Sequence, residues 1–107
     1  MSKSPLRYGI VIPTYGLSHK RLEFALKSIR RFTQGYEYSI LVSDDCTPDH
    51  AERPWQEHVS RKHGAEFRRT DHWGYYWENF HTAGMEMAGK CDVIVFFADD
   101  CLASLGW

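Results

Sequence analysis

Two pairs of neighbouring aspartates are the residues of this sequence best suited to chemistry. Asp44–Asp45 follows the apolar run 38–43, and Asp99–Asp100 follows the apolar run 92–97. Two carboxylate pairs at one edge of a sheet repel each other unless positive charge or hydrogen-bond donors lie between them. Carboxylate oxygens are the ligands that hard divalent cations prefer, so the pairs predict either a metal ion or the donor groups of a bound molecule.

Each pair also has simpler interpretations. Aspartates are common in turns and helix caps, and one carboxylate can bind the vicinal hydroxyls of a ribose. No glycine-rich phosphate loop follows the first apolar run, so bound phosphates would have to be held by a metal. Tyr15, directly after that run, could either pack against the protein or stack on a base.

The residues between these motifs predict an alternation of strands and helices, in the order β-α-β-α-β-α-β. Strands are predicted over 8–12, 38–43, 65–69 and 92–97, the third near a sheet edge and the fourth, the most apolar, in the centre. Three helices are predicted. The first runs from a cap at Ser18 to about Phe32, and the second begins at about Pro54 and has Trp55 and Val59 on one side. The third ends at about Ala88. This order indicates a mostly parallel sheet with helices on both faces, whose ligands bind at the carboxyl ends of the strands.

Length and composition define the class of molecule. The chain has 107 residues, 43% hydrophobic and 25% charged, which fits one globular domain over residues 1–107. Thirteen basic against fourteen acidic side chains leave no basic excess, so we expect no nucleic-acid partner. No run approaches the ~20 apolar residues of a membrane helix and no secretory signal is evident, so we expect a cytoplasmic protein. The spacing of the cysteines and histidines favours neither a disulfide framework nor a metal site.

Three motifs resemble those of family 2 glycosyltransferases with the GT-A fold. They are Ile10-Val-Ile-Pro-Thr-Tyr15, Leu41-Val-Ser-Asp-Asp-Cys-Thr-Pro-Asp49 and Val93-Ile-Val-Phe-Phe-Ala-Asp-Asp100. The family pattern has strands that end in P-T-Y-N, in D-D-G-S-T-D and in an acidic D-x-D type motif, in this order. The segment Ala83–Gly89 matches the small-residue helix end that precedes the last motif. The resemblance extends from Tyr8 to Trp107 and implies a Rossmann-like sheet of GT-A type, the N-terminal half that binds a nucleotide sugar.

The resemblance also implies roles for individual residues. Pro13, Thr14 and Tyr15 would line the pocket for uracil or another base. Asp45 would form a hydrogen bond to the base or ribose, with Asp44 beside it. The implied donor is a nucleoside diphosphate sugar, with a UDP-sugar favoured, and the acceptor is unknown.

The second aspartate pair would hold the other end of the donor. Asp99 would meet the ribose or sugar, and Asp100 would ligate Mn²⁺ or Mg²⁺ that bridges the diphosphate. Such a metal acts as a Lewis acid that stabilises the departing nucleoside diphosphate. Family members usually invert the anomeric centre by direct attack of an acceptor hydroxyl.

Several positions depart from the family pattern. Cys46 stands where the family has glycine, Gly16 where it has asparagine, and Thr82 where it often has asparagine. In the family the acceptor site and the general base follow the D-x-D motif, and no residue of this chain suggests itself as the base. We therefore expect that the 107 residues bind the donor without turning it over.

Two other functions fit parts of the sequence. A non-catalytic module that binds a nucleotide sugar or carbohydrate would carry the same motifs. A receiver-like phosphoacceptor domain has the same length and alternation, but its acidic pair should follow the first strand. The aromatic cluster of Trp73, Tyr75, Tyr76 and Trp77 could belong to the core, bind a sugar, or form an exposed surface that leads to self-association.

Overall fold

The computed structural model describes residues 6–15, 19–47, 52–71, 74–97 and 103. These form four strands and three helices in strict alternation, as the sequence predicts. The strands are β1 (Arg7–Thr14), β2 (Glu37–Asp44), β3 (Glu66–Arg69) and β4 (Val93–Phe96). The helices are α1 (His19–Phe32), α2 (Glu52–Lys62) and α3 (Tyr75–Ala88).

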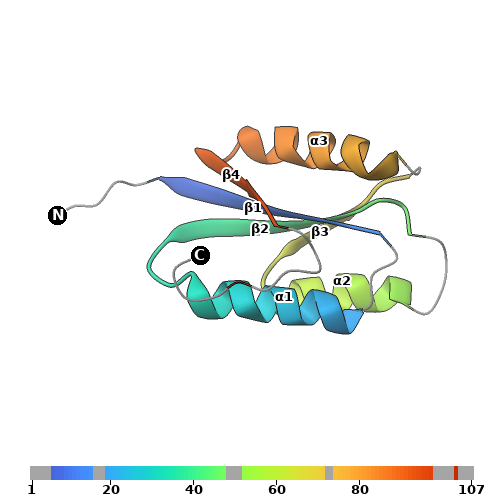
Figure 1. Cartoon of the computed structure of the whole chain (residues 1–107), viewed down its shortest axis with the longest axis horizontal. Coiled ribbons are helices and arrows are strands. Elements are labelled where there is room, and N and C mark those ends of the chain that lie inside the picture. Colours follow the sequence, from blue (N-terminus) through green and yellow to red (C-terminus); the bar gives the residue numbers. More distant parts are fainter. Residues whose placement is uncertain (1–5, 16–18, 48–51, 72–73, 98–102, 104–107) are drawn as a thin grey trace.

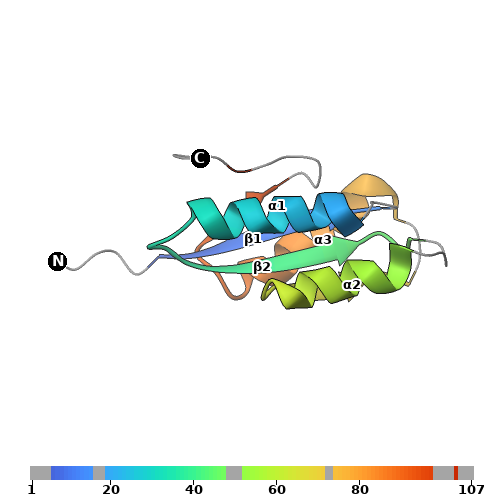
Figure 2. The ribbon, with the colours of Figure 1, turned by 90° about the horizontal axis from the view of Figure 1, so that it is seen from below.

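The strands form one sheet in the order β3-β2-β1-β4, and all three neighbouring pairs are parallel. Helices α1 and α2 lie together on one face of the sheet, and α3 covers the other face (Figure 1). Figure 2, seen from the side of α1 and α2, shows these two helices side by side along the strands. The predicted fold class, a parallel α/β sheet with helices on both faces, is confirmed.

Strand alternation divides the hydrophobic core into two parts. Ile10 and Ile12 of β1 pack with Ile40 and Val42 of β2 against the α1–α2 layer. The residues between them, which include Val11 and Leu41, pack against Ala83 and Met87 of α3. Both central strands are apolar on two sides because both sides are covered, which explains their continuous runs of β-branched residues.

The structure confirms the predicted position of one strand in the sheet and corrects that of another. The arginine-containing strand β3 lies at an edge, as predicted. The most apolar strand, β4, does not lie in the centre: among the described residues it pairs with β1 alone. Its Val93 and Phe96 are each more than a third exposed, and the Phe96 ring stacks on Phe80 of α3 at 3.9 Å between centroids. Apolar composition alone therefore misplaced this strand.

One local prediction is also corrected. Pro13 does not stop the first strand but lies inside it, opposite Ser43 of β2 and beyond the segment that pairs with β4. An edge position of this kind tolerates a residue that has no amide hydrogen. In α2, Trp55 and Val59 lie four residues apart on one side of the helix, as predicted, with Val59 buried and Trp55 half exposed. The predicted cap at Ser18 lies outside the described residues. Among the described helices, none has the length and apolar character needed to cross a bilayer.

Candidate functional site

The candidate site lies where β1 and β2 end side by side. Thr14, the last residue of β1, is in register with Asp44, the last residue of β2. The pairing continues one residue further, because the amide of Asp45 donates to the carbonyl oxygen of Thr14 at 2.9 Å. The first acidic pair is therefore fixed by backbone hydrogen bonds at the carboxyl edge of the sheet, where parallel α/β folds bind ligands.

The two aspartates of this pair point to opposite faces of the sheet. Side chains alternate along a strand, so Asp44 follows Val42 toward the α1–α2 layer, and Asp45 follows Ser43 toward α3. Their contacts agree with this geometry. Asp44 is hydrogen-bonded to Arg69, which also contacts α2. Asp45 is hydrogen-bonded to Gly74 at the start of α3. Both side chains are almost completely buried.

Asp44 holds the end of the sheet together. Its Oδ1 accepts hydrogen bonds from the hydroxyls of Thr14 (3.2 Å) and Thr47. Its Oδ2 accepts from the Thr47 amide at 2.7 Å and from Nε of Arg69 at 3.0 Å. Both carboxylate oxygens are thus occupied by groups of the protein, which compensates for the burial of the charge. Asp44 supports the site, and its oxygens are already engaged.

Arg69, at the end of β3, extends this network to the helix layer. Besides its ion pair with Asp44, its Nη2 donates to Oε1 of Gln56 at 2.8 Å, and Gln56 is fully buried in α2. Its guanidinium also lies 4.9 Å from the ring centroid of Phe67. The sequence reasoning missed Arg69 as part of the site. The alternation of side chains along β3 was the available signal, because it places Arg69 on the same face of the strand as the apolar Phe67.

Asp45 has one of its two carboxylate oxygens hydrogen-bonded within the part of the chain that the structure describes. Its Oδ1 accepts a hydrogen bond from the amide of Gly74, at the start of α3, at 2.9 Å. Its Oδ2 is buried and has no hydrogen-bond partner among the described residues. An unpartnered buried carboxylate oxygen is unfavourable by itself, and native proteins keep such atoms where a ligand or solvent completes the bonding. Asp45 therefore has one buried carboxylate oxygen at the rim whose partner is not among the described residues.

The residue after the acidic pair explains one departure from the family pattern. Cys46 has a φ of 56°, in the left-handed region that side chains rarely adopt. Glycine adopts this conformation without strain, which accounts for the glycine of the D-D-G pattern. In this chain a cysteine takes the left-handed conformation that a glycine would adopt without strain.

Asn79 of α3 is a second buried polar residue that the sequence reasoning missed. Its Nδ2 donates to the carbonyl oxygen of Ser43 at 2.8 Å, and its Oδ1 accepts from the Ser43 hydroxyl at 2.6 Å. The same hydroxyl accepts from Nη2 of Arg68 at 2.9 Å. Thr82, which aligned with the family's asparagine, is exposed and donates to the Glu78 carbonyl oxygen of its own helix. Asn79 shares the inner face of α3 with Ala83, four residues on, which was the signal for its burial.

The other predicted site residues differ in how much surface they present. Pro13 and Thr14 are buried in β1, and only Tyr15 reaches the surface, with 49% of it exposed. Asp99 and Asp100 lie outside the described residues. Within the described ranges no group of three or more metal-ligating side chains comes together.

One pocket lies at the opposite edge of the sheet. It has a volume of about 160 Å³ and is lined by Tyr8 and Tyr38 near the starts of β1 and β2, and by Met87 and Lys90 at the end of α3. Parallel α/β sheets place their ligands at the carboxyl edge instead. We therefore take the rim around Asp45 as the candidate site.

The fold and this rim define a class of protein: a Rossmann-like α/β domain of GT-A type with its acidic loop at the carboxyl ends of the strands. The family model of glycosyl transferase family 2 matches residues 9–107, so the chain belongs to this family. Among solved structures, the crystal structure of S. aureus TarS is similar, with a TM-score of 0.66 and 18% sequence identity. The match covers 89% of this chain and 17% of TarS. No curated protein matches the chain significantly.

Proposed function

We propose that this domain binds a nucleoside diphosphate sugar, a UDP-sugar foremost, together with a divalent cation, as the donor site of a sugar transfer to an acceptor hydroxyl. Membership of glycosyl transferase family 2 supplies the reaction class. The observation that carries the proposal is the buried Oδ2 of Asp45, which has no partner among the described residues at the carboxyl edge of the sheet.

The chemistry of Asp45 favours a base with a ring N–H. The N3–H of uracil can donate to a carboxylate oxygen, whereas N3 of cytosine carries a lone pair that a carboxylate repels. The bond from the Gly74 amide fixes the orientation of the carboxylate before any ligand arrives. Tyr15, half exposed at the end of β1, is suited to stack on the same base. The two residues together would select uracil over cytosine.

The metal and sugar end of the donor is assigned to the second acidic pair. Asp100 would hold Mn²⁺ or Mg²⁺ and Asp99 would meet the ribose or sugar, since carboxylate oxygens suit these hard cations. The bound cation would stabilise the negative charge that develops on the leaving nucleoside diphosphate. The chain has no glycine-rich loop after β1 for the phosphates, which agrees with a metal in that role.

Isothermal titration calorimetry of the 107-residue protein tests this proposal. We expect UDP to bind in the presence of Mn²⁺, CDP to bind at least tenfold more weakly, and EDTA to weaken UDP binding. Asp100→Ala should abolish the metal dependence and leave the circular dichroism spectrum unchanged. The absence of heat with UDP, GDP and TDP would refute nucleotide binding. Binding that is equally strong with EDTA would refute the metal.

A further inference from the structure

The charges of this protein are divided unevenly between its layers. Helices α1 and α2 together contain eight basic and three acidic residues. The rest of the chain contains five basic and eleven acidic residues, because the totals are thirteen and fourteen. The formal charge of −1 therefore conceals a strongly basic helix layer and an acidic remainder.

The basic residues of α1 form a stripe opposite its buried face. Leu22, Ala25, Leu26 and Ile29 point into the core. At 100° per residue, positions 20, 24, 27 and 31 fall on the opposite side of the helix. All four of these positions are exposed: they are Lys20, Phe24, Lys27 and Arg31.

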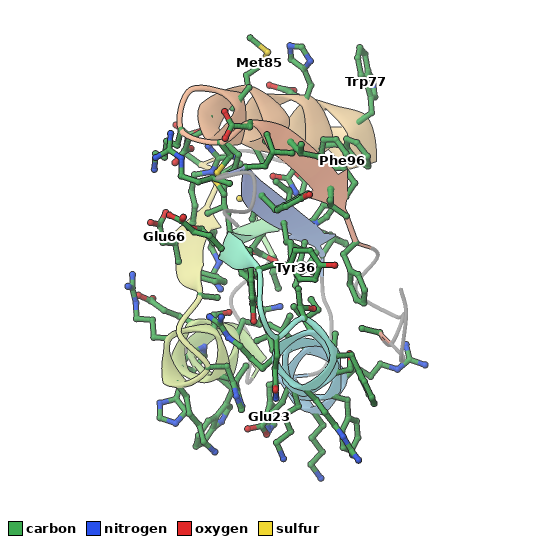
Figure 3. The ribbon with its side chains drawn as sticks, turned by 90° about the vertical axis from the view of Figure 1, so that its left-hand side faces the viewer. Glu23, Tyr36, Glu66, Trp77, Met85 and Phe96 are labelled. Atoms are coloured by element: carbon green, nitrogen blue, oxygen red, sulfur yellow. The ribbon has the colours of Figure 1, made fainter. Side chains whose placement is uncertain are left out.

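Helix α2 extends this surface. It lies beside α1 on the same side of the sheet and contributes Arg61 and Lys62 from its last turn. The acidic side chains described in the two helices are each paired with a basic side chain: Glu57 pairs with Arg61 at 2.9 Å, and Glu23 pairs with Lys62 at 3.2 Å. Figure 3, viewed along the helices, shows nitrogen-tipped side chains projecting from α1 and α2 away from the sheet, with Glu23 between the helices. We call this surface, made by Lys20, Phe24, Lys27, Arg31, Arg61 and Lys62, the basic face.

An exposed phenylalanine lies within the basic face. Phe24 is 60% exposed, although its helix has a complete apolar side elsewhere, so the core has no need of it. A large aromatic ring surrounded by lysine and arginine is typical of surfaces that adsorb to anionic membranes. The basic groups are attracted to the headgroups, and the ring enters the interface between headgroups and acyl chains.

We propose that the basic face binds the surface of an anionic lipid bilayer. Charge complementarity selects the partner, and each lysine or arginine near such a surface contributes about the same favourable increment. The two helices lie side by side along the strands (Figure 2), which lets the basic side chains of both helices contact one plane together. The exposed phenyl ring distinguishes a bilayer from a soluble polyanion, because only the bilayer offers an apolar phase for it. This proposal is independent of the nucleotide site.

Co-sedimentation with vesicles tests the proposal. We expect the protein to bind vesicles of phosphatidylcholine with 30% phosphatidylglycerol, and to bind vesicles of phosphatidylcholine alone at least tenfold more weakly. Raising the salt from 0.05 M to 0.5 M should release it, because the attraction is screened. Lys27→Glu should weaken binding at least tenfold, whereas Lys90→Glu, the same change on the α3 side of the sheet, should weaken it less than threefold.

Phe24 separates the bilayer from other anionic partners. Phe24→Ser, at an exposed position, should weaken vesicle binding at least threefold without changing the thermal unfolding midpoint. Heparin should bind the wild type and this variant equally. The proposal is overturned if anionic and neutral vesicles bind alike, if Lys27→Glu and Lys90→Glu have equal effects, or if Phe24→Ser leaves vesicle binding unchanged.

Discussion

Replacing each aspartate of the first pair by asparagine should have opposite consequences at the two positions. At Asp45 the asparagine oxygen can still accept the hydrogen bond from the Gly74 amide. The amide nitrogen then replaces Oδ2, the oxygen that has no partner among the described residues. Because no internal bond is lost, Asp45→Asn should change the free energy of unfolding by less than about 1 kcal/mol.

Nucleotide binding should respond strongly to the same change. The variant presents a donor where the wild type presents a charged acceptor, so the bond from uracil N3–H is lost. A hydrogen bond to a charged group contributes about 1.5–3 kcal/mol, which corresponds to roughly 10–150-fold weaker UDP binding. The new donor suits N3 of cytosine, so the preference for UDP over CDP should also shrink. Calorimetry with both nucleotides measures the two effects.

Asp44→Asn is the matched control. Here the ion pair with Arg69 is lost, and an amide nitrogen in place of Oδ2 faces two N–H donors, the Thr47 amide and Nε of Arg69, that both lose their acceptor. The buried position and the retained charge of Arg69 make this costly, about 2–4 kcal/mol. For a domain of this size the thermal midpoint should fall by about 8 °C or more. If Asp45→Asn unfolds the protein, or if it leaves UDP affinity unchanged while Asp44→Asn is harmless, the assignment of roles is wrong.

Three further predictions concern the stability of the fold. Hydrogen bonding from His63 lowers the pKa of Glu23 from 4.5 to about 2, so its carboxylate stabilises the fold above pH 4.5 and this contribution disappears as the pH falls toward 2. In acid unfolding curves Glu23→Gln should lack this loss, about 1 kcal/mol after solvent screening. Cys46→Gly should keep full stability, whereas Cys46→Val should cost at least about 1 kcal/mol, since the backbone is left-handed. Asn79→Ala should cost about 2 kcal/mol in urea unfolding and Thr82→Ala less than 0.5 kcal/mol, because only the first breaks bonds to β2.

The order of strands and helices was predictable because each element that packs on the core has apolar residues at a characteristic spacing in the sequence. The apolar runs of β1 and β2 indicate strands covered on both sides, and the helical spacing in α1 indicates one buried face. The place of β4 was not predictable in this way. Hydrophobicity records how much apolar surface a strand carries, but not which neighbours cover it, and the exposed Val93 and Phe96 show the difference.

The motifs indicated the candidate site but did not distinguish the roles of its residues. They identified Asp44 and Asp45 together and gave no place to Arg69, Gln56 or Asn79. These three residues lie between 11 and 34 positions after Asp45, and their contacts depend on how β3, α2 and α3 pack on β2. Long-range polar contacts of this kind have no local sequence period, so a single sequence indicates them only weakly.

Alternation along β2 is what lets two identical neighbours take different roles. A carboxylate that turns toward the helix layer meets Arg69 and the Thr47 amide, and its charge is compensated inside the protein. The next carboxylate turns the other way and accepts one amide hydrogen, so its other oxygen has no partner among the described residues. The first role supports the second: bonds from Thr47 to Asp44 fix the loop that carries Asp45, so a ligand meets an acceptor already in place. We therefore propose that Asp44 is the anchor and Asp45 the binding group, because alternation along β2 turns their side chains to opposite faces of the sheet.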